Sequence, residues 1–128
     1  ELLLYLGRLP ILQSKSKQSY PSDQVEIIRQ IHEYLLEHME QKVTIERLSR
    51  QYLLSPTTLK TVFKAVYGDS LAAHMKEHRM ERAAALLRQT DQSIAQIASA
   101  VGYESSSRFS NAFRDTYQML PMEYRKKH

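Results

Sequence analysis

An internal repeat of about fifty residues constrains the fold of this 128-residue chain more than any other feature of its sequence. Positions of a first segment recur 49 residues later, pairing Thr44, Ile45, Leu48, Ser49, Tyr52 and Leu54 with Ser93, Ile94, Ile97, Ala98, Val101 and Tyr103. The second copy then has one additional residue in its turn, so the offset becomes 50. From there the repeat pairs Leu59, Val62, Phe63, Lys64 and Tyr67 with Phe109, Ala112, Phe113, Arg114 and Tyr117. The chain is therefore expected to contain two structural units of the same kind.

Each copy of the repeat has the pattern of a short helix, a turn and a second helix. In the first copy, Thr44 is placed to cap a helix, and Ser55-Pro56 combines a capping hydroxyl with a proline at the first helical position. In the second copy, Ser93 begins a capping box and Ser105 can cap the following helix. A small residue in each first helix lets the second helix cross closely, as in a helix-turn-helix.

The rest of the sequence predicts helices as well. Apolar residues follow helical spacing over residues 25–39, and Pro121 begins a last turn or two. A longer helix is expected over about residues 71–88, with an apolar face of Leu71, Met75, Ala83, Leu86 and Leu87. The composition, with only 3 Gly and 4 Pro, favours helices over a sheet. We therefore predict an all-α chain whose helix-turn-helix units occupy about residues 23–69 and 91–127.

Residues 1–22 differ in composition from the remainder. Residues 1–9 resemble the end of an amphipathic helix, and residues 13–22 are polar and without periodicity, as in a linker. The short apolar start lacks the features of a signal peptide, and no run reaches the roughly 18 apolar residues of a membrane span. We interpret residues 1–22 as the end of a preceding effector or sensor domain plus its linker; a dimer contact is the alternative for the leucines. The absence of cysteine fits a reducing cytoplasm.

The repeat also predicts which side chains of the second helices point away from the core. A step of two residues turns a helix by about 200°, so the outward residues of the first copy are Thr57, Lys60, Thr61 and Lys64. The same step in the second copy selects Ser107, Ser110, Asn111 and Arg114. Both faces lack acidic residues and offer hydroxyls, an amide and cations, which are groups that read bases and bind phosphates in a DNA major groove. An ordinary solvated helix surface is the alternative.

The distribution of charge agrees with this interpretation. The net charge is +4, and residues 56–128 carry 11 Lys and Arg against 7 Asp and Glu, whereas residues 23–55 carry 4 against 6. The positive excess therefore lies where the candidate reading helices lie, which favours a polyanionic partner.

Several motifs, in order and at their spacing, resemble the DNA-binding domain of the AraC/XylS family over roughly residues 25–127. They are Ser55-x-x-x-Leu59-x-x-x-Phe63-Lys64-x-x-x-Gly68, Arg79-Met80-x-x-Ala83-x-x-Leu86-Leu87, Ile94-x-x-Ile97-Ala98-x-x-Val101-Gly102-Tyr103, Phe109-x-x-x-Phe113-Arg114 and Pro121-x-x-Tyr124-Arg125. The resemblance implies seven helices, in two homeodomain-like three-helix units joined by a linker helix. It also implies that residues 23–128 form a DNA-binding domain.

The resemblance further implies that the third and sixth helices read successive segments of the major groove of double-stranded DNA. Matched by position, the base-reading residues are Thr57, Thr58, Lys60, Thr61, Ser106, Ser107, Arg108, Ser110 and Asn111. We expect Lys64 and Arg114 to contact phosphates. The chain would belong to a bacterial, cytoplasmic transcription regulator that contacts RNA polymerase, with activation and repression both open. A small-molecule effector and a homodimer would act through a further domain, and no cofactor is expected.

Two positions depart from the family pattern. Leu53 stands where the family usually has glycine and where the second copy has Gly102. Because a residue other than glycine is strained at positive φ, we expect this turn to be wider or to follow another backbone path. Gln118 also stands where a glycine is common in the family.

One motif points to a different chemistry. His74-Met75-Lys76-Glu77-His78 has the H-x-x-E-H spacing of a zinc-protease motif, with both histidines on one helix face. A zinc site needs a third protein ligand, and no convincing one is apparent in the sequence. We therefore interpret these residues as solvated histidines of the linker helix and predict no metal.

Two other classes of function, an enzyme and a protein-binding adaptor, compete with DNA binding. The sequence has no glycine-rich phosphate loop, no plausible pair of catalytic carboxylates and no nucleophile motif, so no enzyme is predicted. The remaining alternative is a helical adaptor that binds protein through the same faces. Such an adaptor would carry apolar outward stripes, whereas the stripes of residues 56–67 and 105–117 are polar.

Overall fold

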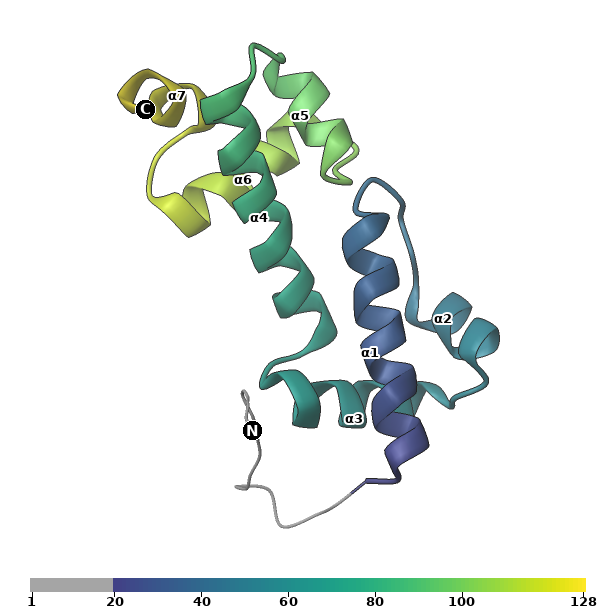
Figure 1. The fold of residues 1–128 in the computed structure, drawn as a ribbon. Helices are drawn as coiled ribbons and strands as arrows, with labels where there is room; N and C mark the ends of the chain where they lie inside the picture. Colours follow the sequence, from purple (N-terminus) through teal and green to yellow (C-terminus); the bar gives the residue numbers. More distant parts are fainter. Residues whose placement is uncertain (1–19) are drawn as a thin grey trace.

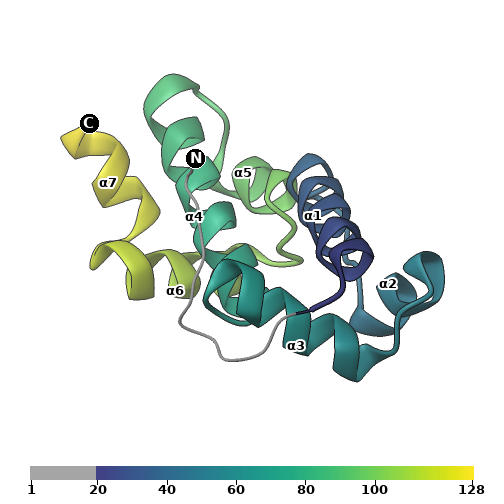
Figure 2. The same ribbon diagram turned by 60° about the horizontal axis from the view of Figure 1, so that its bottom comes forward.

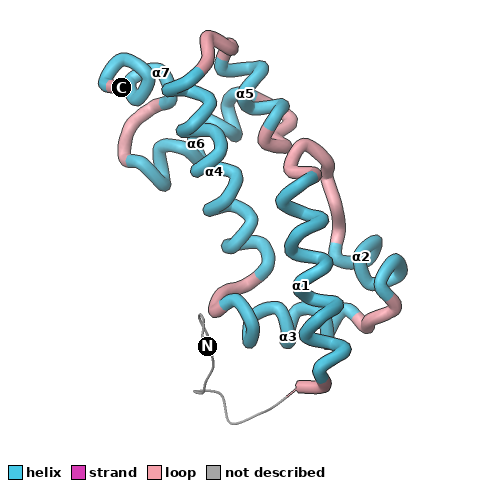
Figure 3. The backbone as a smooth tube through the Cα atoms, viewed as in Figure 1, coloured by secondary structure: helices cyan, strands magenta, loops and turns pink. Residues whose placement is uncertain are grey.

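A computed structural model describes residues 20–128 of the chain, and all of its regular elements in that range are helices. The seven helices are α1 (Ser22–Glu37), α2 (Ile45–Tyr52), α3 (Pro56–Tyr67), α4 (Leu71–Gln89), α5 (Ile94–Ala100), α6 (Ser106–Tyr117) and α7 (Pro121–Lys127). Short loops connect them (Figures 1 and 3). The all-α prediction is confirmed, and the repeat appears in the bounds, because α3 and α6 have the same length and begin 50 residues apart. The helix expected over residues 1–9 lies outside the described residues.

The predicted capping residues begin the helices. The side-chain oxygens of Thr44, Ser55 and Ser105 each accept a hydrogen bond from the backbone N–H three residues later, and Ser93 forms the predicted capping box with Gln96. These bonds satisfy N–H groups that the first turn of a helix leaves without a partner. The boundaries of the helices are therefore set locally.

Two separate cores hold the helices together, and α4 contributes to both. The first core joins α1, α2 and α3 to Met75 of α4. The second joins α5, α6 and α7 to Met80, Ala83, Ala84 and Leu87 of α4. Met75 and Met80 are five residues apart, a rotation of about 140° between their directions on a helix. The predicted linker is therefore a shared structural element, which Figure 1 shows crossing the molecule from α3 to α5 and α7.

The last motif of the sequence closes the end of α4. Arg125 of α7 donates hydrogen bonds from Nε to the Leu87 carbonyl and from Nη2 to the Thr90 carbonyl, both at 3.1 Å. The Arg88 guanidinium donates to the Tyr124 hydroxyl at 2.7 Å. Carbonyl groups at a helix C-terminus need such partners, so α7 fixes the end of the helix that the two units share.

The expectation for the first turn is wrong. Leu53 adopts the left-handed conformation, with φ 58° and ψ 41°, at the position where Gly102 of the second turn has φ 89°. The backbone bonds also match, since Leu54 N–H donates to the Ser49 carbonyl as Tyr103 N–H donates to the Ala98 carbonyl. The first turn therefore keeps the backbone path of the second and accepts the strain. Gln118 is left-handed as well, with φ 64°.

The helices are not of the membrane-spanning kind. Among the residues that the structure describes, no helix combines the length and the apolar character that crossing a bilayer requires.

Candidate nucleic-acid interface

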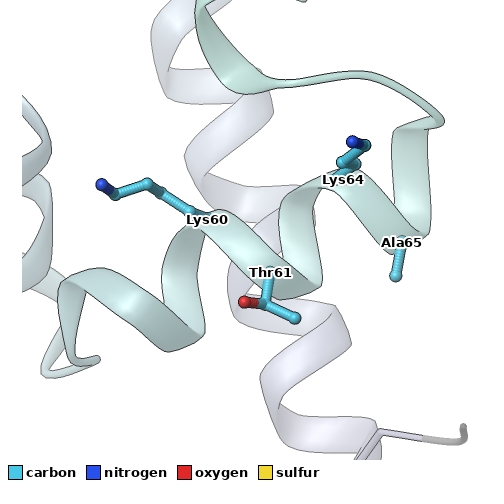
Figure 4. Close-up of a pocket in the computed structure, with 4 residues that line it drawn as sticks. All are labelled: Lys60, Thr61, Lys64 and Ala65. Atoms are coloured by element: carbon cyan, nitrogen blue, oxygen red, sulfur yellow. The ribbon is translucent and has the colours of Figure 1, made fainter.

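Helix α3 presents the predicted first reading face to solvent. Thr57, Lys60, Thr61 and Lys64 are exposed, while Leu59, Val62 and Phe63 on the opposite side are buried. Lys60, Thr61, Lys64 and Ala65 line a shallow, open hollow on this surface (Figure 4). The two lysines extend from one edge of the helix, one turn apart, and Thr61 and Ala65 from the other. The face is thus free, concave and cationic.

Thr58 lies differently from the other predicted readers of α3. It is half-buried, and its hydroxyl accepts a hydrogen bond from the Ser55 hydroxyl at 2.9 Å. Its backbone N–H donates to the same Ser55 oxygen at 3.1 Å. Thr58 therefore takes part in the N-terminal cap of α3 and is less available than its neighbours.

Helix α6 presents the second face. Ser106, Ser107, Arg108, Asn111 and Arg114 are exposed, and Ser110 is half-buried. The Arg114 guanidinium approaches the Asn111 amide, with Nη2 3.5 Å from Oδ1. This contact orients the amide oxygen of the exposed Asn111 toward the arginine. Spacing alone did not indicate a pairing between these two residues.

The two faces lie on one side of the molecule. In Figure 2, α3 and α6 both run along the lower side of the view, with α4, α5 and α1 above them. Their shared support is α4, to which each of them packs. Both helices are therefore held by one common element.

The electrostatics of this side favour an anion. Helix α3 contains no acidic residue, and the only acidic residue of α6, Asp115, lies 3.9 Å from Lys76 of α4. Among the described residues, Glu104 is the acid nearest the start of α6 along the chain, and it forms an ion pair with Lys42 at 2.9 Å. The Lys42 ammonium holds the pKa of Glu104 below its usual range, through a hydrogen bond and its charge. The two acids at the α6 face are thus paired with lysines.

The description of His74 and His78 as solvated is wrong. Their side chains are 14% and 30% exposed, and they meet His32 of α1 at the junction of α1, α3 and α4. His32 lies 42 residues before His74, so no local pattern in the sequence links the two. The third imidazole that the sequence did not reveal is supplied by tertiary packing.

The fold and its two exposed faces define a protein with tandem helix-turn-helix units of the DNA-binding kind. Residues 48–127 match the family described as "Helix-turn-helix domain". The regulatory protein SoxS of Salmonella typhimurium is 31% identical over 100 residues, which cover 78% of this chain and 94% of that protein. The chain therefore belongs to the AraC family of helix-turn-helix transcription regulators, as its motifs predicted.

Solved structures agree with this assignment. The C-terminal domain of AraT, a response regulator from Geobacillus stearothermophilus, is 33% identical with a TM-score of 0.76, covering 80% of this chain and 85% of that one. The DNA-binding domain of AdpA, solved with a target DNA, has the same fold, with a TM-score of 0.74 at 23% identity over 78% of this chain and 90% of that one. Three further curated regulators are longer, and this chain spans 28%, 38% and 42% of their lengths.

Proposed function

We propose that this chain binds double-stranded DNA in a sequence-specific way, with α3 and α6 in successive segments of the major groove, and thereby regulates transcription. The observation that carries the proposal is the pair of matched faces on α3 and α6, which are exposed, offer hydroxyl, amide and cationic groups, and belong to helices that both pack on α4. A helix fits the major groove, and hydroxyl, amide and cationic groups can bond to its base edges. Apolar outward stripes, which an adaptor would need, are lacking on α3 and α6.

The dimensions of the molecule bear on how the DNA is engaged. Helix α4 has 19 residues and is therefore about 28 Å long, whereas adjacent turns of the groove lie about 34 Å apart. Two readers fixed to a support of this length must bend the duplex or engage it unequally. Part of the specificity then comes from the deformability of the DNA sequence.

The exposed side chains divide into two roles. Thr57, Lys60 and Thr61 of α3 are the proposed base readers of the first unit, with Thr58 holding the helix cap. In the second unit the proposed readers are Ser106, Ser107, Arg108, Ser110 and Asn111. Lys64 and Arg114 stand further along the helices and are proposed to bind phosphate. Most of these side chains are short, which favours water-mediated and shape-based reading over long bidentate contacts.

The resemblance to the family supports a proposal for the wider assembly. We propose that the protein acts in the bacterial cytoplasm and contacts RNA polymerase, and that effector binding and dimerisation belong to a part of the protein outside residues 23–128. No catalytic role is proposed. The relatives named above are a regulatory protein and a response regulator, which supports a regulatory role.

A selection and a salt series test the proposal. Binding sites would be selected from random duplexes, and the affinity for selected and unselected DNA would be measured between about 50 and 200 mM salt. We expect a steep fall of affinity with salt for both, because phosphate contacts release counterions, and a tighter Kd for selected DNA at every concentration. The absence of any affinity for duplex DNA at low salt would refute the proposed function.

A further inference from the structure

We propose that His32, His74 and His78 form a binding site for a divalent transition metal, with zinc(II) as the first candidate, which links α1 to α4. The Nε2 atoms of His32 and His78 lie 2.8 Å and 3.1 Å from Nε2 of His74. One ligand atom from each of the three imidazoles lies within 4.8 Å of the others. Three imidazole nitrogens with an open fourth position are a ligand set that zinc uses in proteins.

An outer carboxylate orients one of the three rings for this role, and a second carboxylate faces another ring. The Nδ1 atom of His74 lies 3.2 Å from Oδ1 of Asp69, and its N–H donates a hydrogen bond to this carboxylate. Nδ1 of His78 faces the Glu81 carboxylate at 3.7 Å. In His74 the hydrogen bond to Asp69 leaves the lone pair of Nε2 directed into the cluster. Carboxylate–histidine pairs of this kind fix the tautomer and raise the basicity of metal-bound imidazoles.

The close nitrogen pairs of the cluster suit a cation when Nδ1 carries the proton in His74 and His78. If Nδ1 carries the proton in both His74 and His78, their Nε2 atoms meet at 3.1 Å as two acceptors. Nε2 of His32 can donate to only one lone pair, so at least one close nitrogen pair has no proton between its atoms. A metal ion takes all three lone pairs. In a tetrahedral site with Zn–N bonds of about 2.0–2.1 Å, the nitrogens would stand about 3.4 Å apart. The two distances seen, 2.8 Å and 3.1 Å, are about 0.6 Å and 0.3 Å shorter, so the rings would move apart by these amounts on binding.

The surroundings shield the cluster and connect it to a reading helix. The His32 ring stacks on Tyr67 of α3, with ring centroids 4.2 Å apart at 20°, and the Phe63 ring stands edge-on to His74 at 5.6 Å. The three histidines are half-buried. A metal bound here would tie α1, the end of α3 and α4 together; in Figure 1, α3 leads into α4 and α1 runs alongside.

A second group around His74 offers a competing site. Ligand atoms of Asp69, His74 and Glu77 also lie within 4.8 Å of one another, and Glu77 is exposed. Zinc and similar ions prefer imidazole to a set dominated by carboxylates. We therefore assign the metal to the three imidazoles and Asp69 to the orientation of His74.

Cobalt(II) spectroscopy tests the site directly, on the metal-free chain without a polyhistidine tag. We expect saturable 1:1 binding with the intense visible absorption of tetrahedral cobalt, abolished by zinc. His32→Gln and His78→Gln should each weaken binding at least tenfold, while His38→Gln, outside the cluster, should leave it unchanged. Circular dichroism checks that each variant is folded. No 1:1 binding by the unaltered chain, or equal losses in His38→Gln, would overturn the proposal.

Two further variants separate the competing sites. Asp69→Ala should lower the metal affinity by about 10- to 100-fold, as expected of an orienting carboxylate, and Glu77→Gln should leave it unchanged. If Glu77→Gln loses the metal while His32→Gln keeps it, the carboxylate group is the site and the proposal is wrong.

Thermal unfolding gives an independent measurement. At zinc concentrations about 100 times Kd, the Tm of the chain should rise by roughly 10 °C, and that of His32→Gln should not. Magnesium, which prefers oxygen ligands, should leave both unchanged. An unchanged Tm with zinc, or an equal rise in the variant, would count against the site.

The effect on DNA rests on the proposed function and is measured separately. For the unaltered chain, the affinity for selected DNA should change when zinc is added. For His32→Gln, zinc should leave this affinity unchanged. Equal affinities with and without zinc would refute the coupling to α3, while the cobalt spectrum still decides the metal site. If DNA binding is absent altogether, the proposed function fails and the spectroscopic result stands alone.

Discussion

Gly102 in the turn of the second unit lies against the backbone carbonyl of Met39, just beyond the end of α1 in the first unit. A β-carbon at position 102 would overlap the Met39 oxygen, and the Arg79 side chain of α4 lies beside the same point. The Lys42–Glu104 ion pair joins the same two loops. The turn glycine therefore has two functions, since it allows a positive φ and lets the two units touch.

Gly102→Ala should be the more damaging of two matched glycine substitutions. Gly68 has nearly the same φ, 91° against 89°, but an added β-carbon there meets nothing within 4 Å. Gly68→Ala should cost only the backbone strain, about 1 kcal/mol. Gly102→Ala adds the overlap with Met39, for a total of about 2–4 kcal/mol. Urea unfolding of the two variants measures the difference, and equal losses would mean that the Met39 loop gives way.

Leu53→Gly should stabilise the chain. Leu53 is left-handed and 89% exposed, so its side chain gives up backbone energy without burying apolar surface. Glycine removes a strain of about 1–2 kcal/mol and adds freedom to the unfolded chain, for a net gain of about 0.5–1 kcal/mol. Leu53→Ala keeps the strain and serves as the control. A gain in the alanine variant as large as in the glycine variant would assign the effect to the exposed leucine side chain.

The sequence predicts the helices well because the signals for their boundaries are local. Capping hydroxyls act within three residues, and the repeat supplies each signal twice. The apolar face of α4 was predicted only in part: Met75, Ala83 and Leu87 are buried as expected, but Met80 and Ala84 are buried too. The sequence pattern predicts one apolar stripe along α4, whereas the helix turns different sides toward the two cores. That division depends on the tertiary structure.

The candidate site, too, could be predicted only in part from the sequence. Exposure of Thr57, Lys60 and Asn111 follows from helical periodicity, because it is the complement of a buried stripe. The histidine cluster does not follow, since the sequence places only His74 and His78 on one helix face. His32 joins them through the packing of α1 on α4. Contacts between helices that are far apart along the chain leave no periodic pattern in the sequence.

Stability of the metal-free chain should fall as the pH is lowered from about 6.5 to 4. Burial, together with the neighbouring His74 and His78, lowers the pKa of His32 to about 4, from 6.5 in the unfolded chain. Between these values the unfolded state binds more protons, so acid favours unfolding. Urea titrations across this range should show a smaller pH dependence for His32→Gln than for His38→Gln. Identical curves for the two variants would show that His32 titrates normally in the folded chain.

Asn111→Ala should relax sequence preference more than it weakens binding as such. Its amide can pair with the edge of an adenine, a contact worth about 1–3 kcal/mol of discrimination. We expect a loss of about that size on selected DNA, little loss on random DNA, and degeneracy at one position of the site when selection is repeated. Gln89→Ala, an exposed amide at the end of α4, is the control. Equal losses on both kinds of DNA would remove Asn111 from the readers.

Lys64 and Arg114 occupy matched positions in the repeat, but their replacement by alanine should affect DNA binding differently. Lys64 is expected to contact phosphate alone, so its loss should weaken all DNA about equally and reduce the salt slope by about one. Arg114 also approaches the Asn111 amide, so Arg114→Ala should additionally relax preference at the position that Asn111 reads. A double-mutant cycle of Arg114→Ala with Asn111→Ala on selected DNA measures this coupling. If the two losses add, the arginine acts on phosphate alone, as its counterpart Lys64 does.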